Sequence, residues 1–272
     1  MNINKAHIAL FIANLIYGIN YSLAKDVMNG FIEPFGFIFI RAGVAMLLFW
    51  FVSFFFRKGK IQIERKDFLR LSICGFFGVA LNQLMFFKGL DFTSPINAGI
   101  IMTMNPIFVI IIASFILKEK ITFIKIIGIV LGILGALTLI IVKSEASFSF
   151  QSTIGDIFVL INAISYGIYL VLVKPLMQKY NTIDIIKWVF TFGFAFVFSF
   201  GFGEFSEISW SGFSTKIWLE LAFVVVCTTF IAYFFNIYAL RNLSPSVVSI
   251  YIYLQPVLAT IFSILFYNGT IN

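Results

Sequence analysis

The sequence predicts an all-α polytopic membrane protein, and three observations carry that prediction. Of its 272 residues 61% are hydrophobic, only 11% are charged, and long apolar runs alternate with short polar connections. A soluble domain carries about 25% charged residues, so this composition excludes a water-soluble domain, a disordered chain and a nucleic-acid-binding protein. The runs are also too long and too uniformly apolar for the ~10-residue alternating strands of a barrel, whereas helices satisfy their own backbone hydrogen bonds in lipid.

Nine segments reach the roughly 20 mostly apolar residues that a helix needs to cross a bilayer. From the N-terminus they span about 6–27, 34–56, 68–90, 95–117, 121–142, 154–174, 184–203, 217–240 and 245–267. The first has no small-residue cleavage site and contains polar residues such as Asn14 and Tyr17, so we expect a retained span rather than a signal peptide. The connections between the segments are too short to fold as soluble domains.

The Lys and Arg residues divide unequally between the two sides of the predicted bundle. Fourteen of the nineteen fall at the N-terminus or in every second connection, four fall on the other side, and Arg41 lies inside a span. Cytoplasmic loops carry an excess of Lys and Arg. We therefore expect a multi-pass protein of the plasma or inner membrane with a cytoplasmic N-terminus.

A repeat of about 150 residues is visible when the sequence is compared with itself. The motifs that recur are Tyr17-Gly18-Ile19 as Tyr166-Gly167-Ile168, Ser94-Pro95 as Ser244-Pro245, and Asn105-Pro106 as Gln255-Pro256. The repeat divides the chain into a first five-helix unit, 1–142, and a second unit, 154–272. Because five is odd, the second unit is inverted relative to the first, which is typical of secondary transporters with a midplane substrate site.

The second unit is expected to lack its fifth helix. The counterpart of the segment 121–142 would follow the last residue, Asn272. We therefore expect nine of ten helices, and we favour a fragment or a truncated reading frame as the reason.

Several short motifs resemble, in order and spacing, those of EamA-domain permeases of the drug/metabolite transporter superfamily. They are Leu15 to Tyr21, Pro34 followed by Arg41, Ala98 through Asn105-Pro106, Lys118-Glu119-Lys120 with Ile121-Thr122, and Gly128, Gly132 and Gly135. The resemblance implies ten helices in two inverted EamA-like halves and a central cavity lined mainly by the first four helices of each half. It also implies export or exchange of small metabolites such as amino acids.

Polar residues inside the apolar segments are the candidates for the wall of a substrate cavity. Asn14, Tyr17 and Tyr21 share one face of the first segment, since spacings of three and four align on a helix, and a polar face is unfavourable toward lipid. The other candidates are Asn82, Gln83, Asn97, Asn105, Asn162, Tyr166, Tyr169, Tyr233, Asn236 and Gln255. The alternative for each is a hydrogen bond between helices, worth about 0.6 kcal/mol on average.

Arg41 is the one charged residue well inside a span. A charge at depth costs roughly 2.5–3.5 kcal/mol on insertion scales, so it is expected to face protein or water. It is a candidate for binding a substrate carboxylate or for a gate. The alternatives are a structural partner such as Glu33, a backbone carbonyl, or extension of the side chain outward to the interface.

Prolines and glycines mark two further features. Pro106 and Pro256 lie within predicted spans, where each removes a backbone hydrogen bond and kinks its helix, so we expect a hinge, with a fixed kink as the alternative. Gly128, Gly132 and Gly135 indicate close helix packing, either within the chain or in a homodimer.

The leading functional hypothesis is a secondary transporter of small polar metabolites that rocks its two halves about a midplane cavity. An intramembrane enzyme is disfavoured, since the chain has no paired intramembrane carboxylates and only one His, His7. No cofactor or metal is expected, and no P-loop is present to bind ATP. A non-transporting membrane assembly or scaffold protein is the alternative. The expected partners are the lipid bilayer and a small-molecule metabolite.

Overall fold

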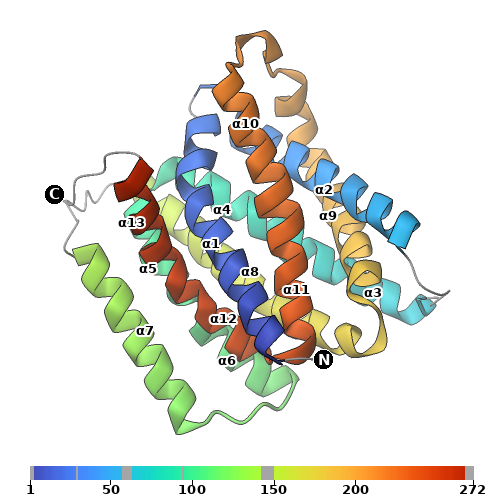
Figure 1. The fold of residues 1–272 in the computed structure, drawn as a ribbon, viewed down its shortest axis with the longest axis vertical. Helices are drawn as coiled ribbons and strands as arrows, with labels where there is room; N and C mark the ends of the chain where they lie inside the picture. Colours follow the sequence, from blue (N-terminus) through green and yellow to red (C-terminus); the bar gives the residue numbers. More distant parts are fainter. Residues whose placement is uncertain (1–2, 29, 57–62, 94, 142–149, 267–272) are drawn as a thin grey trace.

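The computed structural model describes residues 3–28, 30–56, 63–93, 95–141 and 150–266, which form helices and connections without a strand (Figure 1). The α-helices are α1 (Ile3–Met28), α2 (Pro34–Phe56), α3 (Arg65–Gly75), α4 (Leu81–Phe92), α5 (Pro95–Met102), α6 (Asn105–Ile116), α7 (Phe123–Ile141), α8 (Phe150–Lys179), α9 (Thr182–Ser206), α10 (Thr215–Phe223), α11 (Ala232–Asn242), α12 (Pro245–Ile250) and α13 (Leu254–Phe266). Short π-helical or 3₁₀ turns join some of them.

Five helical stretches in the described part of the chain are long and apolar enough to cross a membrane. They are residues 34–55, 65–92, 153–179, 182–206 and 215–242, and shorter apolar helices cover 105–116 and 245–258. The lengths agree with the ~20 residues that a bilayer requires. The protein is therefore an all-helical polytopic membrane protein, as its composition predicts.

Two predicted spans are not regular α-helices throughout. In the segment predicted over 95–117, α5 ends at Met102 and α6 begins at Asn105; in 245–267, a 3₁₀ turn over Tyr251–Tyr253 separates α12 from α13. Pro106 and Pro256 each fall in the first turn of the helix that follows the break. Proline is tolerated there because the first N–H groups of a helix have no intrahelical partner. Each proline therefore lies next to a local irregularity in the helical hydrogen bonding of its segment, and whether it acts as a hinge or a fixed kink stays a prediction.

Two long stretches contain a π-helical turn, at Phe76–Ala80 between α3 and α4 and at Val224–Ile231 between α10 and α11. A π turn accommodates an extra residue and changes which side chains face inward after it. The second π turn contains the adjacent threonines Thr228 and Thr229, which are both buried, at 1% and 0% exposure.

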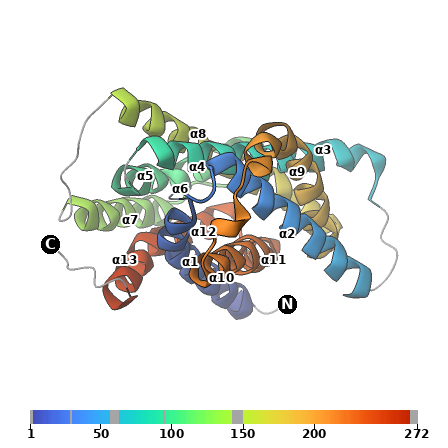
Figure 2. The same cartoon turned by 90° about the horizontal axis from the view of Figure 1, so that it is seen from above.

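The helices pack in pairs that join the two ends of the sequence. α2 lies along α9, α1 packs against α11 and α13, and α8 packs against α4 and α6 (Figure 2). Helix α3 approaches α9 closely, since a Cβ on Gly75 would lie 2.7 Å from the carbonyl oxygen of Val189. Helix α7 lies at the edge of the bundle.

The glycines of α7 were expected to mark close packing. A Cβ built on Gly128 would meet nothing within 4 Å, so no approach among the described residues requires a glycine there. The surroundings of Gly132 and Gly135 lie outside the described part of the structure.

Candidate functional site

A polar cavity of about 100 Å³ lies between the helices. Its lining residues come from both halves of the sequence: Asn14, Tyr17, Asn20, Arg41, Asn82, Gln83, Phe86, Phe87, Met102, Asn162, Tyr166, Thr228, Tyr233, Asn236, Val248, Ile252 and Gln255. Helices α7 and α9 contribute none of these residues. Among them only Arg41 has a formal charge at neutral pH, and ten of the seventeen lining residues are Asn, Gln or Tyr.

Amide side chains connect helices that are far apart in sequence. The Nδ2 group of Asn162 donates to the carbonyl of Asn82 at 2.7 Å, and Asn82 Nδ2 returns a bond to the carbonyl of Asn162 at 3.4 Å. Gln255 Nε2 donates to Oδ1 of Asn14 at 2.8 Å, and Asn14 Nδ2 donates to Leu10 O at 2.8 Å. These bonds orient the amides in the cavity wall, since each donating nitrogen is identified by an oxygen that can only accept.

Tyrosines and their amide partners form the next part of the wall. Gln83 Nε2 donates to the hydroxyl of Tyr233 at 3.3 Å, and Asn236 Nδ2 donates to the hydroxyl of Tyr17 at 3.1 Å. The rings of Tyr17 and Tyr233 meet edge to face with centroids 6.4 Å apart, a geometry that aromatic pairs prefer. The phenols are therefore held by neighbours and do not rotate freely into the cavity.

Arg41 on α2 is buried, with 3% exposure. Its Nε donates to Oγ1 of Thr229 at 3.0 Å, and the guanidinium carbon lies 5.3 Å from the ring centre of Phe37 and 4.7 Å from that of Phe87. The Nη1 atom is buried and has no hydrogen-bond partner. The groups around the guanidinium are therefore Thr229 and two aromatic rings, and not Glu33, which was the predicted structural partner.

Other unpaired polar atoms lie around the same cavity. Buried lining atoms without a hydrogen-bond partner are Asn20 Oδ1, Gln83 Oε1, Asn162 Oδ1 and Thr228 Oγ1, in addition to Arg41 Nη1. Buried polar groups are normally satisfied by protein or by water. A cluster of unsatisfied atoms around one cavity therefore indicates a space for polar contents.

Four of the predicted wall residues lie elsewhere or are not described. Tyr169 is 1% exposed and its ring packs against Gly78, outside the lining set. Asn105 is fully buried and donates to the carbonyl of Ala163 at 2.7 Å. Asn97 lies near the start of α5, is half-buried, and is not among the lining residues. The side chain of Tyr21 is outside the described part of the structure.

Seven residues line the cavity that the sequence analysis did not predict as wall residues. Asn20 follows Tyr17 by three positions, so helical spacing alone could have added it. Thr228 lies in a π turn, whose altered phase is not visible in the sequence. The others, Phe86, Phe87, Met102, Val248 and Ile252, are apolar and resemble ordinary core residues.

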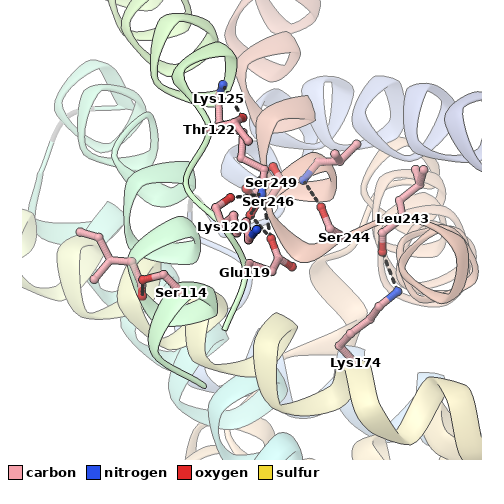
Figure 3. Close-up of polar contacts among 12 residues, drawn as sticks. Ser114, Glu119, Lys120, Thr122, Lys125, Lys174, Leu243, Ser244, Ser246 and Ser249 are labelled. Carbon is pink, nitrogen blue, oxygen red and sulfur yellow. Dashed lines mark hydrogen bonds and ion pairs between the residues drawn. The ribbon is translucent and has the colours of Figure 1, made fainter. Parts of the chain in front are cut away.

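Polar contacts join the two halves of the chain beyond the cavity as well. Oε2 of Glu119, between α6 and α7, accepts from Oγ of Ser246 on α12 at 2.8 Å and from Nζ of Lys125 at 2.9 Å (Figure 3). Near it, Nζ of Lys174 donates to the carbonyls of Leu240 at 2.6 Å and Leu243 at 2.8 Å, at the end of α11. At the start of α2, Oε2 of Glu204 accepts the backbone N–H groups of residues 35 and 36 at 2.6 and 2.8 Å.

A bundle of apolar helices around a cavity lined by polar side chains is the architecture of a helical membrane transporter. Among the described residues no group of three or more His, Cys, Asp or Glu is placed to hold a metal ion. The family follows from comparison with known proteins. The model of the EamA-like transporter family matches residues 4–141 and 153–272, and the chain belongs to that family.

Individual relatives agree with this assignment. The chain is 24% identical over 261 residues to the uncharacterized transporter YyaM of Bacillus subtilis, covering 94% of this chain and 84% of that protein. It is 24% identical over 264 residues to an uncharacterized transporter of Archaeoglobus fulgidus, covering 96% and 88%. A solved crystal structure with 16% identity has the same fold, with a TM-score of 0.78 over 98% of this chain and 90% of that one.

Proposed function

We propose that the protein is a secondary transporter, an exporter or exchanger, of small polar metabolites such as amino acids. The observation that carries the proposal is Arg41, buried in the cavity wall with an unpaired Nη1 atom. A buried charge without a charged partner is unfavourable. A substrate carboxylate in the cavity would supply that partner through charge-assisted hydrogen bonds.

The other unpaired atoms fit the remainder of such a substrate. Asn20 Oδ1, Gln83 Oε1 and Asn162 Oδ1 are acceptors, and an ammonium or hydroxyl group of a substrate would donate to them. A zwitterion presents one carboxylate and three N–H donors. The cavity therefore complements an amino acid better than it complements a purely apolar solute, and a polar centre of this kind favours transport over a scaffold role.

The proposed mechanism is alternating access, in which two inverted halves, 1–142 and 154–272, rock about the cavity. The family model matches one segment in each half. Equivalent contacts support the same relation: Asn105 Nδ2 binds the carbonyl of residue 163, and Gln255 Nε2 binds Asn14. In the proposed repeat, 105 corresponds to 255 and 14 to 163.

The lining residues contain no Asp or Glu, so the cavity offers no carboxylate to carry a proton. Facilitated diffusion or exchange therefore fits better than obligate proton coupling. We further propose nine spans with the N-terminus in the cytoplasm of a plasma or inner membrane. The charge distribution supports this orientation, and a homodimer through α7 would give its exposed face a partner.

Transport in proteoliposomes tests the proposal. Vesicles that contain the full chain are loaded with unlabelled L-amino acids, and uptake of a radiolabelled L-amino-acid mixture by counterflow is measured. We expect uptake above that of protein-free vesicles, and a loss of at least tenfold in Arg41→Gln. Thr191→Val, which alters a hydroxyl on α9 away from the lining residues, serves as the control. Uptake equal to that of empty vesicles would count against the proposal.

Cysteine labelling tests the orientation. A single cysteine at Glu64 is expected to react from the cytoplasmic side only, and one at Ser209 from the outer side only. Both positions are outside the long apolar stretches. Labelling of the two from the same side would contradict the proposed topology.

A further inference from the structure

In the hydrogen bond between Thr229 and Arg41, the threonine hydroxyl can only be the acceptor. It is fully buried, its hydroxyl donates to the carbonyl of Val224 at 2.9 Å, and its oxygen accepts from Arg41 Nε at 3.0 Å. A hydroxyl has one proton, and a guanidinium can only donate. Because the proton is given to Val224, the oxygen that faces Arg41 is a fixed acceptor.

The π-helical turn at Val224–Ile231 creates this arrangement. The carbonyl that receives the Thr229 proton lies five residues earlier in the chain. Within this turn Thr228 lines the cavity, and its neighbour Thr229 binds the guanidinium of Arg41, another residue of the cavity wall. Thr228 Oγ1 is buried and has no hydrogen-bond partner, and its residue belongs to the cavity lining.

The guanidinium is thus held on three sides. Thr229 binds Nε, and the rings of Phe37 and Phe87 lie within 5.3 and 4.7 Å of its central carbon. A guanidinium has five N–H donors in a fixed plane. Fixing Nε and the plane therefore also fixes Nη1, the buried atom that has no partner.

We propose that Thr229 is the positioning residue of a carboxylate subsite, in which Arg41 Nη1 and Thr228 Oγ1 receive the ligand. The use of this subsite in transport rests on the proposed function, but the subsite itself does not. Thr229 prevents the guanidinium from rotating its Nε toward the ligand and holds the donors in one orientation. The cavity then distinguishes a carboxylate from a neutral group of the same shape, because only the anion compensates the buried charge.

Acetate and acetamide are the probes, since they are nearly identical in shape and differ in charge. The full chain is labelled with [¹⁵N]arginine and placed in nanodiscs, and the Arg41 signals among the five arginines are assigned with Arg41→Lys. We expect acetate to shift the Arg41 signals at concentrations at least tenfold lower than acetamide does. Exchange of the Arg41 Nε–H with solvent is measured on the same samples.

Three variants separate positioning from general stability. In Thr229→Val, which is isosteric but has no hydroxyl, we expect the dissociation constant for acetate to rise at least tenfold, that for acetamide to stay within twofold, and Nε–H exchange to accelerate at least tenfold. Thr229→Ser keeps the hydroxyl, so its two dissociation constants and its Nε–H exchange rate should stay close to the wild-type values. Thr191→Val is the matched control, since Thr191 also accepts from a side-chain N–H, that of Trp50, and donates to a backbone carbonyl, that of Lys187.

Several results would overturn the inference. One is wild-type protein that binds acetate no more tightly than acetamide. Another is Thr229→Val that weakens both probes equally, as a merely structural role predicts, or that leaves Nε–H exchange unchanged. These outcomes are independent of the transport assay: a chain that binds acetate through this subsite and moves no amino acid would contradict the proposed function alone.

Discussion

Gln83 on α4 donates a hydrogen bond across 3.3 Å to the hydroxyl of Tyr233 on α11, and the two residues stand 150 positions apart. In the proposed repeat they occupy the same position in the two units. Tyr233 in turn donates to the carbonyl of Gly78 at 3.4 Å, at the π turn of the first half. A direct bond between equivalent positions places the meeting point of the two halves in the wall of the cavity.

A double-mutant cycle on this pair measures how strongly the halves are coupled there. Gln83→Leu and Tyr233→Phe are each expected to lower the free energy of unfolding, with a coupling of about 0.5–1.5 kcal/mol, because a buried hydrogen bond contributes about that much. Thermal and denaturant unfolding in detergent give the values. Tyr166→Phe removes a hydroxyl from α8 and serves as the control; its effect should add to that of Gln83→Leu. If the free-energy changes of Gln83→Leu and Tyr233→Phe simply add in the double variant, the 3.3 Å hydrogen bond contributes nothing to stability.

The close approach of α3 and α9 predicts a strong effect at one glycine and little at another. A Cβ on Gly75 would lie 2.7 Å from Val189 O and 2.8 Å from the backbone N of Gly193. Since backbone cannot move aside, Gly75→Ala is expected to cost about 1–3 kcal/mol of stability. Gly128→Ala has open space around it and should be neutral or stabilising by up to ~1 kcal/mol through helix propensity. Melting temperatures of the two variants provide the comparison, and equal losses would contradict it.

The variant Gly128→Ala also tests whether the protein forms a homodimer through α7. A homodimer that packs on the α7 glycines would dissociate in Gly128→Ala while the monomer stays folded. Light scattering of the purified protein, corrected for detergent, would detect the change. An unchanged mass would remove Gly128 from any such interface.

Much of the site is accessible to sequence reasoning because a polar side chain in an apolar helix is a visible exception. Asn14, Tyr17, Asn162 and Tyr166 follow helical spacing and line the cavity. Apolar lining residues such as Phe87 carry no such signal, since they match the surrounding core in composition. Sequence periodicity also assumes 100° per residue, so it fails wherever a π turn inserts an extra residue.

The irregular turns within 95–117 and 245–267 could not be predicted from the sequence for a related reason. Proline within an apolar run predicts a disturbance, but whether the helix kinks or ends depends on what receives the freed backbone groups. The partner of Glu119 was equally hidden, because Ser246 is 127 positions away. Pairings of that separation follow from the packing of the whole bundle rather than from local pattern.

Acid should weaken one contact at the surface. Hydrogen bonds from Lys179 and Lys66 hold the pKa of Glu64 below its ordinary value near 4.5, with N–O distances of 2.7 Å to each. Because the folded state lowers this pKa, the stabilisation is present above the unfolded value and is lost as the pH falls through the folded one. Glu64→Gln should therefore melt below wild type at pH 7, and this difference should shrink as the pH falls below the ordinary glutamate value and through the lowered pKa of Glu64. The gap at pH 7 should shrink in 1 M NaCl, which screens exposed charges; a gap that is constant with pH and salt would exclude this origin.

The bond between Glu119 and Ser246 predicts a link between a loop of the first half and the cavity wall of the second. Ser246 is fully buried in the first turn of α12, two residues before the lining residue Val248. Glu119→Ala leaves the Ser246 hydroxyl and the Lys125 ammonium without their carboxylate, which costs about 1–3 kcal/mol for a charged hydrogen bond. A cysteine at Val248, in a background without Cys74 and Cys227, should then react with maleimide severalfold faster, because α12 is less firmly held. Lys120→Ala, which removes an exposed neighbouring side chain, is the control and should leave the rate unchanged. If Glu119→Ala also leaves it unchanged, the Glu119 contact does not restrain the wall.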